Sequence, residues 1–332
     1  GGSVLADGAV VNTGDIAIIQ GTLSGDTLDN AGMLTGSADI FADVTNAGGM
    51  TINADSLIAG ALTNDGTVTI QNGVLTILGA LTNNGTIVGD STRGASPDGF
   101  FIDGTLLLGA SSSLTLPAGA AVSLSGDFGA AIDDAHRFDL ADAELRLTGV
   151  GPLQRVEAMS ADVGADSLGL TRGPGRFPLG ALSVGLTPAV VELVDIYDND
   201  GAPGQEAVYT RRLTVAPGAE LRTNGVRVYY QTLSLQGSVD TPANLIALAS
   251  TCPADFSGDG LVDSQDLAAL LAQSVEGAVG QIALALHHRQ THQCLGAGQE
   301  NAAALQCVLV VEGDVIGLNS SKSVSLGRPF TR

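Results

Sequence analysis

The chain contains no tryptophan, and aromatic residues make up only 4% of its 332 residues. Hydrophobic residues still account for 44%, so a sizeable core is available and must be built from Leu, Val, Ile and Ala. There are also 45 glycines. This composition excludes an aromatic-rich core and favours many short, similar layers over one irregular globule.

Basic residues are also scarce, at 14 against 35 acidic residues, and no Lys or Arg precedes Arg93. The formal charge of −21 argues against nucleic-acid binding, because phosphate contacts need clustered Lys and Arg. It argues equally against docking on anionic lipid. Such a charge suits a medium rich in divalent cations.

Cysteine is absent from the first 251 residues, and the chain has only Cys252, Cys294 and Cys307. An odd count of three does not make a disulfide framework. No uninterrupted apolar run reaches about 18 residues, so we expect no transmembrane helix. The start at Gly1 shows no charged-then-apolar leader, which fits a mature or truncated product from which a signal peptide has been removed.

An internal repeat is present in the first quarter of the chain. Asn-x-Gly triplets begin at Asn12, Asn30, Asn46 and Asn64, and a related turn begins at Asn83, with spacings of 18, 16, 18 and 19 residues. We attribute these turns to the tolerance of Asn and Gly for positive φ. Runs such as Thr67-Val68-Thr69-Ile70 lie between them and place apolar side chains on one strand face.

A turn and strands that recur every 18 residues or so predict one coil of a parallel β-solenoid. The alternative is an antiparallel β-sandwich with Asn-Gly hairpins. The near-constant period and the missing aromatics favour the solenoid. We assign residues 1–103 to solenoid repeats and residues 104–250 to further β-coils or a capping β-domain.

Residues 255–266 match a calcium-binding loop of twelve positions. Gly260 occupies position 6, where such a loop turns sharply, and Val262 is an apolar anchor at position 8. Ca²⁺ prefers six to eight hard oxygen ligands, and this spacing supplies them. The alternative is an Asp-Gly-rich surface turn. The predicted ligands are the side chains of Asp255, Ser257, Asp259, Asp263 and Asp266 and the backbone carbonyl of Leu261.

The sequence around this loop resembles a type I dockerin repeat. Cys252-Pro253-Ala254 precedes the loop, and Leu267-Ala268-Ala269-Leu270-Leu271 has the apolar spacing of the exiting helix. The resemblance implies a cohesin-type partner contacted through Ser264 and Gln265. Dockerins have two such repeats, whereas residues 251–273 supply one, and Asp266 departs from the Glu found at position 12 of an EF-hand. The predicted fold is therefore mainly β, a right-handed parallel β-solenoid with a small EF-hand-like calcium loop plus helix near the C-terminus.

The Asn-x-Gly coils resemble repeats of secreted bacterial autotransporter passengers and adhesins. The segment 190–246 is similar to stretches that precede dockerin loops in large secreted bacterial repeat proteins. Both resemblances imply an extracellular or cell-surface setting.

The C-terminal tail differs in composition from the rest of the chain. Residues 274–332 hold 4 acidic and 4 basic residues, whereas residues 1–273 hold 31 and 10. We therefore treat the tail as atypical, with a non-native read-through as the hypothesis. Its His287, His288, His292 and Cys294 form a candidate zinc site, with an exposed tail as the simpler interpretation.

Two further clusters of ionisable residues are candidate sites. Asp195, Asp198 and Asp200 are a candidate for a second cation site, although a turn explains them as well. Asp133 and Asp134 with His136 invite an acid–base interpretation, but nothing places a nucleophile beside them and an exposed loop is favoured. We find no catalytic constellation and do not expect an enzyme.

Three functions compete. The favoured one is a secreted or cell-surface, adhesin-like structural protein whose calcium loop stabilises or docks the chain. The alternative is a non-catalytic part of a polysaccharide-degrading enzyme, for which a groove holding Arg137, Arg146 or Arg155 with an Asp is the feature to seek. The third is a solenoid that binds a flat polysaccharide surface through stacked Thr rows, of which only Thr67 and Thr69 show the spacing clearly. The expected partners are thus a cohesin-type protein or a cell-surface polysaccharide.

Overall fold

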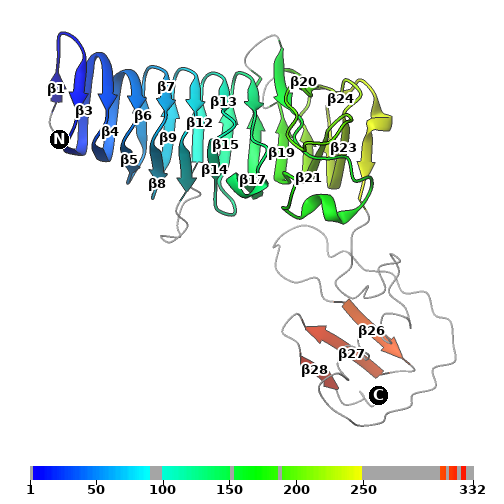
Figure 1. The fold of residues 1–332 in the computed structure, drawn as a ribbon. Coiled ribbons are helices and arrows are strands. Elements are labelled where there is room, and N and C mark those ends of the chain that lie inside the picture. The colour runs from blue at the N-terminus through cyan, green and yellow to red at the C-terminus, as the bar shows by residue number, and fades with distance from the viewer. Residues whose placement is uncertain are drawn as a thin grey trace. The chain divides into compact units, whose positions relative to one another are not determined.

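The computed structural model describes residues 3–89, 99–149, 153–185 and 189–248, together with the strands between residues 307 and 326. The chain divides into two compact units, Gly1–Leu248 and Ala249–Arg332. The first unit is a parallel β-solenoid of about 12 turns (Figure 1). The predicted fold class is confirmed to that extent: mainly β, with parallel strands stacked coil upon coil.

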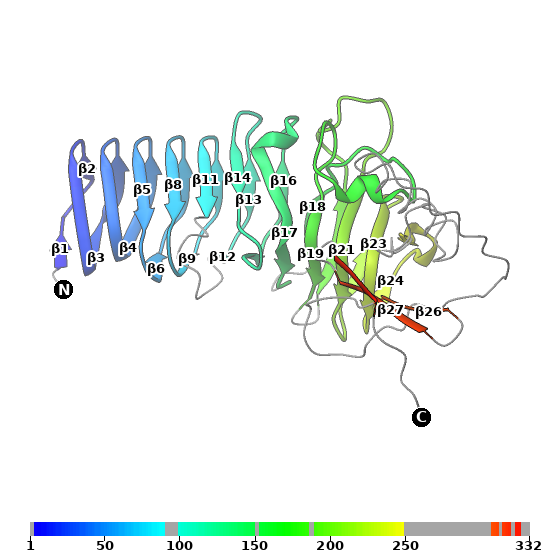
Figure 2. The ribbon, with the colours of Figure 1, turned by 90° about the horizontal axis from the view of Figure 1, so that it is seen from below.

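The coils stack their strands in three parallel rows, named here A, B and C. Figure 2 shows β5, β8, β11 and β14 as successive strands of row A. Row A contains β5 (Gly49–Ile52), β8 (Thr67–Ile70), β11 (Thr86–Gly89), β14 (Ser113–Thr115) and β25 (Leu245–Ala247). Row B contains β1 (Ser3–Leu5), β6 (Ser56–Ile58), β9 (Val74–Ile77), β12 (Gly99–Ile102) and β15 (Ala121–Leu124). Row C contains β2 (Val10–Asn12), β7 (Leu62–Asn64), β10 (Leu81–Asn83), β13 (Leu106–Leu108), β16 (Phe128–Ala130), β18 (Gln154–Glu157), β20 (Val190–Val194), β22 (Glu220–Arg222) and β24 (Ser238–Val239).

Longer strands bend from one row into the next. Two of them pass through all three rows, namely β3 (Asp15–Asn30) and β4 (Met33–Asn46). Four others join rows A and B: β17 (Phe138–Leu147), β19 (Leu179–Val184), β21 (Ala207–Val215) and β23 (Arg227–Leu235). Three short 3₁₀ helices lie between described strands: η2 (Ala135–Arg137), η3 (Ser167–Leu170) and η4 (Pro242–Asn244).

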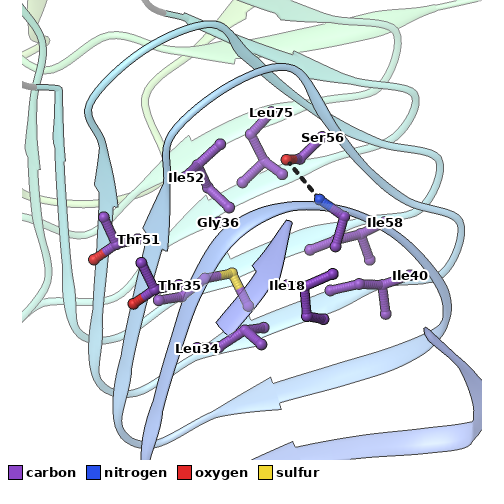
Figure 3. Close-up of a pocket in the computed structure, with 12 residues that line it drawn as sticks. Ile18, Leu34, Thr35, Gly36, Ile40, Thr51, Ile52, Ser56, Ile58 and Leu75 are labelled. Carbon is purple, nitrogen blue, oxygen red and sulfur yellow. Dashed lines mark hydrogen bonds between the residues drawn. The ribbon is translucent and has the colours of Figure 1, made fainter. Parts of the chain in front are cut away.

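Alternating side chains build the interior of the coils. In β8 and β9, Val68, Ile70, Leu75 and Ile77 are fully buried, whereas the threonines between them are not. Figure 3 shows the interior of the first coils, where Ile52 and Leu75 point inward. The cavity there is about 10 Å³, close to the smallest space that holds one water molecule. The coil interior is therefore a packed core and not a ligand site.

A buried ladder of asparagine side chains runs along the corner after row C. It consists of Asn12, Asn30, Asn46, Asn64 and Asn83, which are between 0% and 4% exposed. Nδ2 of each of the first four donates to Oδ1 of the next asparagine at 2.6 or 2.7 Å. Each Nδ2 also donates to a backbone carbonyl of the following coil, so the buried amides are well satisfied. The ladder ends where Leu108 takes the next position in register after Asn83.

The glycines of the same triplets serve a different purpose from the one predicted. Neither the asparagines nor the glycines of these turns have positive φ. A Cβ on Gly66 would instead collide with the carbonyl oxygen of Gly48 in the coil before, and Gly32, Gly48 and Gly85 are crowded in the same way. Glycine is therefore required because the backbone of the preceding coil lies too close for a Cβ, and not because the residue adopts a positive φ. The predicted turn positions stand, and the predicted reason is wrong.

Parallel stacking continues through residues 104–248. β10 pairs with β13 and β12 with β15, and the pairing runs on without a break to β23 and β25. The described strands of this segment therefore pair in parallel, as those of the preceding coils do.

The second unit contains three described strands in an antiparallel sheet, β26 (Cys307–Val311), β27 (Asp314–Asn319) and β28 (Ser323–Leu326). These strands lie within the tail that the sequence marks as atypical. The predicted calcium loop at 255–266 and its exiting helix lie outside the described residues, as do His287, His288, His292 and Cys294.

The ladder generates a first prediction. Asn64→Ala removes the acceptor of Asn46 and the donor to Asn83, so we expect a loss of about 2–4 kcal/mol of unfolding free energy, measured by urea denaturation of the full chain. The control is Asn84→Ala, an exposed neighbour, which should stay within about 0.5 kcal/mol of the parent. Equal denaturation midpoints for the two variants would contradict the ladder's role.

The glycine contacts generate a second prediction. Gly66→Ala forces a Cβ against the preceding coil and should cost about 1–3 kcal/mol. Gly14→Ala is the matched control, because a Cβ on the first glycine of the series meets nothing within 4 Å. If thermal unfolding shows the same loss for both variants, backbone preference and not stacking explains the glycines.

Candidate functional site

A cluster of carboxylates lies at the end of row C, around the loop that joins β20 to β21. Glu157 is the last residue of β18, and Asp195 follows the last residue of β20, the strand that pairs with it. Glu206 directly precedes β21, and an antiparallel bridge between Ser160 and Ala207 holds it beside β18. One carboxylate oxygen from each of Glu157, Asp195 and Glu206 lies within 4.8 Å of the other two.

Each carboxylate fastens part of the loop through backbone hydrogen bonds. Oε1 of Glu157 accepts from the N–H groups of Ile196 and Tyr197 at 2.7 and 2.8 Å. Oε1 of Glu206 accepts from those of Asn199 and Asp200 at 2.5 and 3.0 Å. The loop is thus wrapped around two acidic side chains that are each 3% exposed.

The second oxygens of these two side chains have no hydrogen-bond partner. Oε2 of Glu157 and Oε2 of Glu206 are buried and unpaired, and so is Oδ1 of the buried Asn199. Asn199 uses its Nδ2 to donate to the carbonyl oxygens of Ala130 and Ile132. A buried polar atom without a partner costs about 1–3 kcal/mol, and more if it is charged, so these oxygens call for an explanation.

Two of the aspartates that the sequence offered as a turn or a cation site, Asp198 and Asp200, form turn hydrogen bonds and also lie in a second group of carboxylates. Oδ1 of Asp198 accepts from the N–H of Gly201, and Oδ1 of Asp200 accepts from that of Ala202, at 2.8 and 2.7 Å. These bonds form the predicted turn. Carboxylate oxygens of Asp198, Asp200 and Glu206 also lie within 4.8 Å of one another, so Glu206 belongs to two overlapping groups.

Burial raises the pKa of both glutamates. For Glu206 burial raises the pKa to about 8, against the lowering effect of two backbone N–H donors, and the charges of Asp195 and Asp200 raise it further. Burial also raises the pKa of Glu157, to which the charge of Asp195 adds. Among the ion pairs of the described residues, none involves a carboxylate of this cluster. When these carboxyl groups ionise, no arginine of the described residues pairs with them.

The arginines that a catalytic groove would need are engaged at the surface. Arg137 pairs with Asp134, Arg146 with Glu144 and Arg155 with Glu192, over 3.6, 2.6 and 3.6 Å. Asp134 also caps η2 by accepting from the N–H of His136, which agrees with the loop interpretation of that pair.

Threonine rows on row A are more extensive than the sequence spacing revealed. Thr35, Thr51 and Thr69 are in register on neighbouring strands of row A. Thr67 and Thr86 are likewise in register with each other, two positions earlier on their strands. In Figure 3, Thr35 and Thr51 lie on neighbouring coils and point away from the interior side chains. The rows are visible only after strand pairing is known, because the threonines of one row come from different coils.

Sequence reasoning found Asp195, Asp198 and Asp200 but missed Glu157 and Glu206. Glu206 ends a segment of twelve residues that begins with Asp195. The acidic residue at each end of this segment is visible in the sequence and could have marked Glu206 as a candidate ligand. Nothing local marks Glu157, which reaches the cluster only through the pairing of β18 with β20.

No family model matches the chain, and comparisons with curated proteins and with solved structures give no match. Among the described residues, no helix is long and apolar enough to be a membrane span.

The raised pKa of Glu206 predicts how stability depends on pH. The folded chain keeps this proton up to a pH of about 8, whereas the unfolded chain loses it near 4.5, so folding binds a proton in that window and stability falls as pH rises through it. In the presence of a chelator, the unfolding temperature should drop between pH of about 5 and 8, and Glu206→Gln should flatten this slope. Glu220→Gln, which removes a surface carboxylate paired with Arg222, should keep the parental slope. An unchanged slope in the Glu206 variant would refute the assignment.

Proposed function

We propose that the chain is a secreted or cell-surface structural protein of the adhesin type. The observation that supports this most directly is the uninterrupted parallel stacking from β1 to β25, which repeats the same outward positions coil after coil. A ligand with a regular surface can meet many identical contacts on such a scaffold at once, and each contact can then be weak. The solenoid serves as the stalk and the display surface.

The loop at 255–266 is the second part of the proposal. With oxygen ligands from Asp255, Ser257, Asp259, Leu261, Asp263 and Asp266, it binds Ca²⁺. Binding to the folded form alone stabilises that form by linkage. Its resemblance to a type I dockerin repeat supports docking to a cohesin-type protein as the role of this end of the chain.

A cell-surface polysaccharide is the proposed ligand of row A. Strands in neighbouring coils are about 4.8 Å apart, so the hydroxyl groups of Thr35, Thr51 and Thr69 recur at that interval along the solenoid. A flat array of hydroxyl groups and methyl groups suits a sugar surface, which offers the same two kinds of contact.

The alternative function is a non-catalytic part of a carbohydrate-active enzyme. The dockerin-like loop favours it, because dockerins assemble polysaccharide-degrading enzymes. A groove that holds an arginine with an aspartate would favour this alternative, whereas Arg137, Arg146 and Arg155 form ion pairs at the surface.

Calcium titration tests the loop. Asp259→Ala should remove one bound ion from the full chain in calorimetry, because position 5 supplies a carboxylate ligand. Gln265→Ala, at a position of the same loop that supplies no ligand, should keep the parental stoichiometry. A parent and an Asp259 variant that bind the same number of ions would contradict the loop assignment.

Sedimentation with insoluble polysaccharides tests the row A surface. Thr51→Tyr combined with Thr69→Tyr should weaken retention about tenfold, because bulky rings interrupt the flat array. Thr63→Tyr combined with Thr82→Tyr is the matched control, since these threonines are in register on row C. Equal retention of both double variants, or no retention of the parent by any of the polysaccharides, would reject row A as the binding surface.

A further inference from the structure

We propose that Glu157, Asp195 and Glu206 bind a divalent cation of the calcium class, at a site separate from the loop at 255–266. The proposal rests on the geometry at the end of row C and does not depend on the proposed function. The site would join the ends of two neighbouring coils to the loop between β20 and β21.

The first argument is the spacing of the oxygens. Ca²⁺ binds oxygen at 2.3–2.6 Å, so two ligands of one ion are at most about 5 Å apart. One oxygen from each of the three carboxylates falls within 4.8 Å of the others. The donors are all hard oxygens, without a thiolate or imidazole among them, which favours calcium over zinc.

The second argument is the pair of unpartnered buried oxygens. Oε2 of Glu157 and Oε2 of Glu206 have no donor near them, although Oε1 of each is fully engaged with backbone N–H groups. Glu157 and Glu206 are each only 3% exposed. A cation bound between the two side chains would satisfy both oxygens, and no hydrogen-bond donor in the described part of the chain does so.

The third argument concerns access and charge. Asp195 is exposed, and it lines two open surface depressions, one of which also reaches Glu206. A hydrated ion can therefore reach the cluster and keep water as its remaining ligands. Carboxylates this close repel one another, and the described ion pairs provide no arginine for them, so a cation removes a destabilising interaction.

The competing occupant is a proton, which would leave Glu206 neutral and the cluster unable to hold an ion. Calorimetric titration with calcium chloride at a pH of about 8.5 distinguishes the two. The full chain should carry Asp259→Ala throughout, so that the loop at 255–266 does not contribute. In that background we expect one bound calcium ion.

Two variants in the same background identify the ligands. Glu206→Gln and Asp195→Asn should each weaken calcium binding about 100-fold or more, because each removes a charged ligand. Glu192→Gln is the matched control: it alters a carboxylate on β20 that pairs with Arg155, and it should bind as the parent does. Asp195 is exposed, so its variant keeps the fold even if the Glu206 variant does not.

A second readout is the unfolding temperature. Calcium should raise it in the Asp259→Ala chain and in the Glu192→Gln control, and should leave it unchanged in the Asp195→Asn variant. The proposal is overturned if the Asp259→Ala chain binds no calcium, or if Asp195→Asn binds it as tightly as its parent. These titrations use the Asp259→Ala chain, so they give the same result whether or not the loop at 255–266 binds calcium. The proposal for the loop and the proposal for this cluster can therefore be refuted separately.

Discussion

In-register stacking is the constraint on which the rest of this molecule depends. Every coil must place its strands directly over those of the coil before, so each position meets its own counterpart. The consequences are strictest at the corner after row C, where asparagine amides must bond to each other and glycine must leave room for a carbonyl oxygen.

Repetition makes the choice of side chain decisive. An amide is self-complementary, since its Nδ2 donates and its Oδ1 accepts, and a column of asparagines therefore satisfies itself. A carboxylate is not, because it only accepts when ionised. Where row C brings Glu157 and Asp195 together at the ends of neighbouring strands, none of the ion pairs among the described residues neutralises them.

The two kinds of column lie in different parts of the solenoid. The first coils carry no Lys or Arg and are held by neutral ladders. The later coils carry surface ion pairs and a buried acidic cluster. Burial raises the pKa of Glu157 and of Glu206, so ionisation of either side chain opposes folding at this end of the solenoid.

The sequence by itself determined the coil, because a spacing of 16 to 19 residues between asparagines and the alternation of Thr with Val or Ile are local patterns with a direct structural meaning. It also marked Asp195, Asp198 and Asp200 as a turn. Only the tertiary structure decided why Gly66 must be glycine, which threonines share a row, and that Glu157 and Glu206 meet Asp195. Those facts depend on which residues of different coils lie opposite one another, and register between coils is set by packing across the whole stack.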